Sequence, residues 1–567
     1  METRRLLLAA VLSMAVLLLW QRFFPAPAPV TAPAAESAGA EPVSESPSAV
    51  RPTTEPAAAP AAVAVGESMA TGPPTEATVS QEIVLENELA RAVWSNRGAQ
   101  LTSFELKGHP ANGGGDVDMV RRRQAGLYPF ALVDGGGAGL LLNDALFAVE
   151  RRRDGVSFSY RGAAGSATKT FDLREDGMLE VTVQASGDWR LLIGPGIRNP
   201  SEAEGKTRFA RRAAVYLQAS DVERIDAQGA DEPTVINSTA LSWIGLQDQY
   251  FLAAVLPREG LRDVLVEPML FDLDESGAAA FRPRPIELSG TEEDLGVELR
   301  LLLSPVDDRL AFDAYFGSKQ VHRLSSLPGG LEQAVELGFF GFLARPLLVA
   351  LRWIHDNIVG NYGWAIILLT MLLRIVLFPL NHKSIVSMQK MQNLNPKMQA
   401  IKAKYRSKLK DKKGRPNADA SAKQNQEIMA LYKQEGVNPA AGCLPMLLQM
   451  PVLFSFYSLL SAAVELRRSP WLGWIRDLSA PDPWYVLPIV MGVSMLVQQR
   501  MAPTQGDAMQ RRMFMFMPII FTVLFLGFPA GMVLYWLTNN VLAIAQQAGY
   551  KRWRAARESA VSDSGSK

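Results

Sequence analysis

An arginine lies inside a stretch of the sequence that is otherwise apolar enough to cross a lipid bilayer. The stretch covers residues 362–380, its helix is predicted to end near Pro379, and the arginine is Arg374. A charged side chain near the middle of a membrane-spanning helix costs about 2.5–3.5 kcal/mol on insertion scales. Such residues are rare, and they usually face the interior of a helix bundle or a water-filled cavity rather than lipid. Arg374 is therefore the first candidate for a functional residue.

Polar side chains also occur in four later apolar segments, at residues 440–464, 484–497, 513–528 and 532–548. Within or beside the five segments they are Thr370, Gln449, Ser455, Ser458, Gln498, Thr538, Asn539 and Asn540. Singly, each more often bonds a neighbouring helix than forms part of a functional surface. Together with Arg374 they can line a hydrated cavity, and the five segments contain no Asp or Glu that could pair with the arginine permanently. We therefore expect transient binding of acidic or polar segments rather than catalysis, because charge interactions strengthen where the effective dielectric is low.

Basic residues are concentrated directly after the first apolar stretch. Residues 382–437 contain thirteen Lys or Arg but only four Asp or Glu. Such an excess beside a membrane span predicts a cytoplasmic loop. Methionines at helical spacing, with turn residues at 414–417, predict two antiparallel helices that form a basic hairpin. The same charges could contact lipid headgroups or ribosomal RNA, and the sequence does not choose between them.

The charge distribution also predicts the orientation of the chain. If the hairpin is cytoplasmic, the connection at 465–483 is outside, that at 498–512 is inside, and the tail at 551–567 is inside. The region before the first of the five spans is then outside the cytoplasm. With an N-terminal span, the chain is predicted to cross the membrane six times.

The N-terminal region combines a membrane segment with a linker. Residues 1–24 join a basic start to an apolar run that is about 28 Å long as a helix. This run is either a cleaved signal peptide or a retained signal anchor, and we favour the anchor. Residues 25–80 are rich in Ala, Pro, Glu, Ser and Thr, which predicts a disordered linker.

The region at 81–325 has the pattern of a β domain. Apolar residues alternate with polar ones at 158–160, 179–183 and 297–301, which is the period of half-buried strands. Glycine-rich turns at 112–116 and 134–139 separate such strands. We expect one large antiparallel β-sandwich.

No motif in this region indicates an enzyme or a cofactor. Gly205, Lys206 and Thr207 resemble the end of a phosphate-binding loop, but Pro200 stands where its first glycine would be. The four histidines are scattered in the sequence, which does not support a metal site. The single cysteine, Cys443, excludes an intramolecular disulfide. We expect no enzymatic activity, no cofactor and no metal.

Residues 326–359 connect the β region to the first core span. Apolar residues outnumber charges from residue 331 onwards, and Glu332 and Glu336 share one helical face. We expect an amphipathic helix at the membrane interface. The alternative is a core helix of the β domain.

Four short motifs occur along the second half of the chain, GNYG at 360–363, GVNP at 436–439, GCLP at 442–445 and FPAG at 528–531. Their sequences and their order resemble those of the YidC family of membrane protein insertases in its Gram-negative form. The resemblance covers nearly the whole chain. It implies a multi-domain protein of the bacterial inner membrane, with a periplasmic β-supersandwich and a five-helix insertase core at 360–550.

The resemblance also implies a function and a set of site residues. In the family a hydrophilic groove, open to cytoplasm and lipid but closed toward the periplasm, receives polar segments of nascent membrane proteins and releases their hydrophobic segments into lipid. The expected partners are these nascent chains, the Sec translocon, and ribosome and signal recognition particle components that bind the basic hairpin. The positions that match the groove are Arg374, Thr370, Gln449, Met450, Leu453, Tyr535, Trp536 and Thr538.

Two alternatives remain at this level. The first is a secondary transporter that binds an anionic substrate at Arg374, although no internal repeat of the kind such transporters contain is evident. The second is a carbohydrate-binding or enzymatic β domain on a membrane anchor, which no site motif supports.

Overall fold

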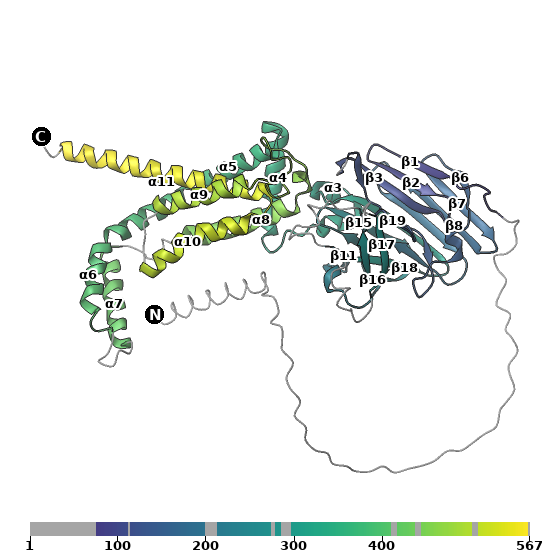
Figure 1. Cartoon of the computed structure of the whole chain (residues 1–567), viewed down its shortest axis with the longest axis horizontal. Coiled ribbons are helices and arrows are strands. Elements are labelled where there is room, and N and C mark those ends of the chain that lie inside the picture. The colour runs from purple at the N-terminus through teal and green to yellow at the C-terminus, as the bar shows by residue number, and fades with distance from the viewer. Residues whose placement is uncertain are drawn as a thin grey trace, which may run out of the picture. The chain divides into compact units, whose positions relative to one another are not determined.

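The computed structural model describes residues 75–111, 114–198, 212–273, 278–284, 296–409, 417–436, 444–501 and 508–564 (Figure 1). The chain divides into two units, Met1–Thr71 and Gly72–Lys567, and the described residues all belong to the second. The predicted anchor at 1–24, most of the predicted linker at 25–80, Cys443 and the segment 200–207 lie outside them.

Three antiparallel sheets form the described part of the β region. The four-stranded sheet has the order β1 (Glu82–Glu86), β2 (Ala90–Ser95), β3 (Gln100–Pro110), β4 (Asp116–Asp118). The six-stranded sheet has the order β13 (Thr234–Asn237), β16 (Leu261–Leu273), β18 (Gly296–Pro305), β10 (Arg190–Ile193), β5 (Leu132–Val133), with β17 (Ala279–Pro283) also paired to β16. The nine-stranded sheet has the order β12 (Asp221–Asp226), β11 (Ala213–Gln218), β14 (Leu241–Gln247), β15 (Phe251–Glu259), β19 (Arg309–Ser318), β9 (Leu179–Ala185), β8 (Gly165–Leu173), β7 (Gly155–Gly162), β6 (Ala148–Arg151).

The predicted alternation holds in one strand and fails in another. In β9, Leu179, Val181 and Val183 are fully buried and alternate with half-exposed residues. In β18, by contrast, every residue from Glu298 to Ser304 is buried. The reason is its position, since β18 lies between β16 and β10 and contributes Leu301 to one apolar cluster and Leu302 to another. A strand covered on both faces needs no polar alternation.

Several polar side chains are buried in the β region, and Lys169 and Glu298 are two of them. Lys169 on β8 is fully buried, and its Nζ donates to the backbone oxygens of Gly98, Ala99 and Phe130 at 2.6, 3.4 and 2.7 Å. Burial lowers the pKa of Lys169 to about 7.

The second group is a carboxylate that serves two arginines. Glu298 forms an ion pair with Arg121, and the Nε of Arg212 lies 3.0 Å from the Oε1 of Glu298. The guanidinium of Arg121 also lies 4.2 Å from the ring centre of Phe271. Because the side chains of Arg121 and Glu298 are 2% and 6% exposed, the charge of Arg121 depends on Glu298 for compensation.

The segment between the β region and the first long helix is not one continuous helix. It contains α3 (Val321–Ser325), the 3-10 turn η3 (Pro328–Ala334), α4 (Gly341–Ile354) and the π-helical turn η4 (His355–Val359). Leu331 and Leu337 are buried in a cluster that includes Trp243 of β14. The predicted amphipathic helix is therefore wrong for residues 331–340. Glycines at 329, 330 and 338 with positive φ break the helix there.

The second half of the segment, α4, is amphipathic. Leu347, Leu348 and Leu351 are buried, whereas Phe342 and Trp353 are 74% and 58% exposed. The buried face contacts α5 (Tyr362–Asn393) and α8 (Leu444–Ala462). The exposed aromatic side chains suit a membrane interface.

The remaining helices are α6 (Asn395–Tyr405), α7 (Ala418–Gln434), α9 (Val486–Met501), α10 (Ala508–Phe525) and α11 (Ala530–Ser564). Shorter 3-10 turns are η1 (Leu141–Asn143), η2 (Ala227–Gly229) and η6 (Val464–Leu466). Helix α11 packs against α5, α8 and α9, and α9 packs against α10 (Figure 1). Within the described residues, Tyr362–Met391 is the helical stretch long and apolar enough to cross a membrane, and Val486–Met501 and Met515–Phe525 are shorter apolar helices.

Two helices continue beyond the ends that the sequence predicts. Helix α5 does not stop near Pro379 but extends to Asn393, with the proline inside the helix. A proline removes one backbone hydrogen bond and its ring crowds the carbonyl one turn earlier, but membrane helices tolerate it. Helix α11 likewise extends through the predicted tail to Ser564.

Helices α6 and α7 lie antiparallel. Lys397 pairs with Glu435 at 2.6 Å, and Lys404 pairs with Glu427 at 2.8 Å. The earlier lysine thus meets the later glutamate, as it must when two helices run in opposite directions. The hydroxyl of Tyr432 also contacts the Sδ of Met398 at 2.8 Å.

Candidate functional site

Arg374 and Asn539 join α5 to α11. The Nε of Arg374 donates to the Oδ1 of Asn539 at 2.8 Å, and its Nη2 donates to the backbone oxygen of Asn539 at 2.9 Å. The arginine side chain is half-buried. Within the described part of the chain Arg374 forms no ion pair with a carboxylate, because both acceptors are neutral oxygens. The guanidinium is thus held in place while its charge stays uncompensated there.

A second polar contact joins α8 to α11. The Nε2 of Gln449 donates to the hydroxyl of Tyr535 at 3.1 Å. The ring of Tyr535 stacks on Phe456 of α8 with 4.2 Å between ring centres. Tyr535 precedes Asn539 by four residues, so the two lie on one face of α11. This face brings Arg374, Gln449 and Tyr535 into one region.

The two predicted threonines bond within their own helices. The hydroxyl of Thr370 donates to the oxygen of Ile366 at 2.6 Å, and that of Thr538 donates to the oxygen of Leu534 at 2.8 Å. Thr370 is only 1% exposed, although it lies one helical turn from Arg374. Its hydroxyl is therefore already satisfied by the backbone.

The three predicted apolar contact residues lie in different surroundings. Met450 and Leu453 are half-buried on α8. Trp536 packs against Phe521 and Phe525 of α10, at 5.8 and 5.1 Å between ring centres. The indole of Trp536 thus contacts α10, whereas the neighbouring Tyr535 contacts α8.

Asn539 and Asn540, which the sequence indicates only as polar residues of a predicted span, are further functional candidates. The side chain of Asn540 is 4% exposed, and its Nδ2 donates to the Oγ of Ser494 on α9 at 3.0 Å. Adjacent residues of a helix point about 100° apart. One amide therefore fixes α11 to α9 while the next faces α5. Two consecutive amides in an apolar helix were the only sequence signal for this arrangement.

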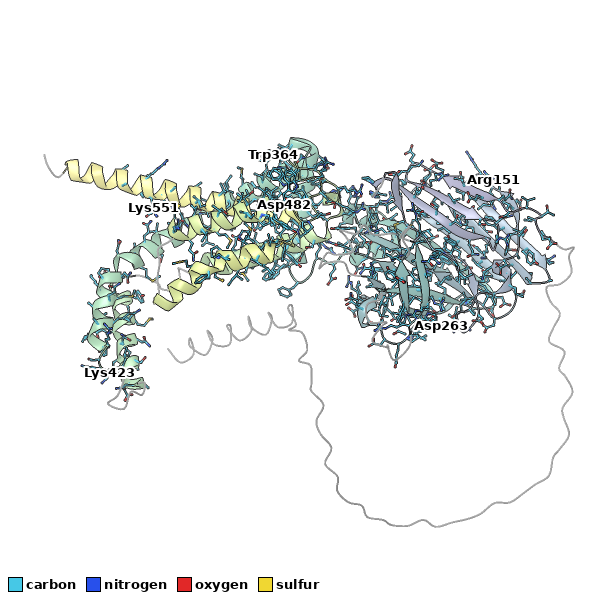
Figure 2. All side chains as sticks on the ribbon, viewed as in Figure 1. Arg151, Asp263, Trp364, Lys423, Asp482 and Lys551 are labelled. Atoms are coloured by element: carbon cyan, nitrogen blue, oxygen red, sulfur yellow. The ribbon has the colours of Figure 1, made fainter. Side chains whose placement is uncertain are left out.

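A packed loop lies at one end of the helices. Asp482 accepts hydrogen bonds from the Nε1 of Trp474 at 2.9 Å and from the amide of Leu487 at 2.7 Å. The amides of Ala530 and Gly531, at the start of α11, donate to backbone oxygens of this loop, each at 2.8 Å. Figure 2 shows Asp482 and Trp364 near this end and Lys551 farther along the helices.

Comparison with known proteins identifies the chain. A family model described as 60Kd inner membrane protein matches residues 353–557, and one described as YidC periplasmic domain matches residues 82–280. These two matches define an inner-membrane protein with a periplasmic domain. The chain belongs to the YidC family of membrane protein insertases, as its motifs predicted.

Individual relatives match over almost their full length. The chain is 34% identical to the membrane protein insertase YidC of Maridesulfovibrio salexigens, covering 96% of this chain and 98% of that protein. It is 32% identical to the insertase of Aromatoleum aromaticum, covering 100% of both. Among solved structures, an active YidC insertase with its first transmembrane domain resolved is 19% identical, with a TM-score of 0.34, over 84% of this chain and 94% of that one.

Proposed function

We propose that this chain inserts membrane proteins into the bacterial inner membrane by giving acidic or polar segments a temporary binding place at Arg374. The observation that carries the proposal is the pairing of Arg374 with the neutral oxygens of Asn539. An arginine paired with a carboxylate would have little attraction left for a passing polypeptide. An arginine held by an amide keeps its full charge for transient binding.

The rest of the proposed groove follows from the neighbours of Arg374. Gln449, Tyr535 and Thr538 lie on the two helices that flank it, α8 and α11. Met450, Leu453 and Trp536 provide the apolar surface along which a hydrophobic segment leaves for lipid. Thioether side chains suit such varied contacts. Thr370 lies one helical turn from the arginine, and its hydroxyl bonds the oxygen of Ile366 within α5.

The groove is proposed to be closed toward the periplasm and open toward the cytoplasm. Support for the closed end comes from the loop around Asp482. Its carboxylate and backbone oxygens accept hydrogen bonds from amides at the start of α9 and of α11. Support for the open end comes from the thirteen basic residues of 382–437. In this orientation the five helices form the insertase core, the α6–α7 hairpin is cytoplasmic, and residues 81–325 form a periplasmic β-supersandwich behind the N-terminal anchor.

The proposed action is binding and release rather than catalysis. The polar segment gains a charged contact inside the membrane, and partition of the apolar segment into lipid completes the transfer. Cooperation with the Sec translocon, and recruitment of ribosome or signal recognition particle components by the basic hairpin, belong to the same proposal.

Substitution of Arg374 tests the proposal. In cells depleted of the native insertase, we expect Arg374→Ala to reduce insertion of a small client with an acidic translocated tail at least about tenfold, corresponding to about 1.4 kcal/mol. Arg374→Lys should retain much of the activity if charge suffices. Insertion is measured as protease protection of the translocated tail.

The matched control is Arg500→Ala, at an exposed arginine near the end of α9. This variant should insert the client as the wild type does. Equal insertion by Arg374→Ala and the wild type would contradict the groove.

A further inference from the structure

Asn539 occupies one edge of the Arg374 guanidinium. Its side-chain and backbone oxygens accept from Nε and Nη2, which together form one of the two-donor edges that a carboxylate can bind bidentately. Neither bond uses Nη1. The edge formed by Nη1 and Nη2 therefore remains the side that Arg374 presents to a ligand.

The orientation of Asn539 is itself fixed by its neighbour. The buried bond from Asn540 to Ser494 holds α11 against α9, and the hydroxyl of Ser494 in turn donates to the backbone oxygen of Met491 at 2.6 Å. This arrangement sets the rotation of α11 about its axis. Because Asn539 is the next residue, its side chain is directed toward α5.

We propose that Asn539 is a positioning residue that orients Arg374 while leaving its charge uncompensated, and that it thereby makes the groove selective for anionic client segments. The inference rests on the proposed function of Arg374. Asparagine has nearly the shape of aspartate and offers the same acceptor at Oδ1, but it carries no charge. An aspartate at this position would hold the guanidinium equally well and would compete with the carboxylates of a client.

This difference allows the charge of residue 539 to be separated from its structural role. Asn539→Asp keeps the hydrogen-bond acceptor and adds a negative charge, whereas Asn539→Leu keeps the approximate size and removes the side-chain acceptor. Each variant is tested with two clients that differ only in their translocated tails. One tail contains Asp and Glu, and the other contains Asn and Gln at the same positions.

We expect Asn539→Asp to lower insertion of the acidic client about tenfold and to change insertion of the neutral client less than about twofold, because a repulsive group acts only on the charged ligand. Asn539→Leu should lower insertion of the acidic client by a smaller factor. Asn357→Asp provides a matched control, since it makes the same amide-to-carboxylate change at an exposed side chain of η4. This control variant should insert both clients as well as the wild type does.

The outcomes separate the inference from the proposal beneath it. If Arg374→Ala fails with the acidic client while Asn539→Asp inserts it normally, the selectivity inference is wrong and the proposed function stands. If Asn539→Asp impairs both clients equally, Asn539 has only a structural role and the inference is also wrong. If Arg374→Ala inserts the acidic client normally, the proposed function itself is wrong.

Discussion

The buried Lys169 predicts an unusual dependence of stability on pH. Its pKa is about 7 in the fold and 10.5 as an ordinary lysine. Between these values the unfolded chain binds a proton that the folded chain does not. Stability therefore rises with pH across this window, because the unfolded state holds more protons. Below about pH 7 the lysine is protonated in both states, and it lowers the free energy of unfolding by a constant amount.

The magnitude follows from the two pKa values. One pKa unit corresponds to 1.36 kcal/mol, so the complete effect between about pH 7 and 10.5 is at most about 5 kcal/mol. Arg123, whose pKa burial lowers to about 9, also titrates in the upper part of this range. Between pH 7 and pH 9 the lysine alone should contribute about 2 kcal/mol. For a domain of this size, that corresponds to a rise of roughly 4–8 °C in melting temperature.

The assay compares the full chain with its Lys169→Met variant in detergent at pH 7 and pH 9. Thermal unfolding is followed by tryptophan fluorescence, since Trp94, Trp189 and Trp243 are buried in the β region. The change in melting temperature from pH 7 to pH 9 is measured for each protein, and the two changes are subtracted. The effects of titrating groups that both proteins share then cancel. The wild type should gain stability from pH 7 to pH 9, and the variant should lack this gain.

The same change in melting temperature between pH 7 and pH 9 in both proteins would refute the reasoning. It would mean that Lys169 keeps its proton in the fold, with the three backbone oxygens of Gly98, Ala99 and Phe130 compensating its desolvation. A change in the absolute stability of Lys169→Met at one pH does not bear on the prediction, because the substitution also removes three hydrogen bonds.

Two further substitutions test the packing of the chain. Glu298→Gln should lower the free energy of unfolding of the β region by about 3–5 kcal/mol, because it leaves the buried Arg121 without its carboxylate; an unchanged urea midpoint would contradict this. Gly363→Ala should destabilise the helical region by about 1–3 kcal/mol and lower its melting temperature, because a Cβ there would lie 2.1 Å from Trp471 and overpack the contact. Gly527→Ala is the control, because a Cβ at that position meets nothing within 4 Å, and equal melting of the two variants would show that Trp471 moves aside.

Much of the organisation was predictable because its signals are local. The excess of basic residues at 382–437 and the charge inside 362–380 are properties of contiguous segments. The alternation at Leu179, Val181 and Val183 reflects the two-residue period of a strand. The four ordered motifs were sufficient to predict the family that the comparisons confirm.

Local patterns were less informative where helices end. Residues 326–359 have the composition of one amphipathic helix, but glycines with positive φ divide them into a buried segment and α4. Pro379 suggested the end of a helix that in fact continues to Asn393. In both places the composition is compatible with more than one backbone path, and packing against neighbouring elements selects between them.

By itself, the sequence determined that a charged residue would lie within a membrane segment and that no acidic residue of the five apolar segments could neutralise it. The tertiary structure alone decided which group holds that residue. Arg374 and Asn539 are 165 positions apart, and no periodicity or spacing relates them. Their contact depends on the packing of α5 against α11 and on the rotation of α11 that the bond between Asn540 and Ser494 sets. Such pairings come from the folded arrangement of helices, since a helix's own sequence specifies which residues share a face but not which neighbour that face meets.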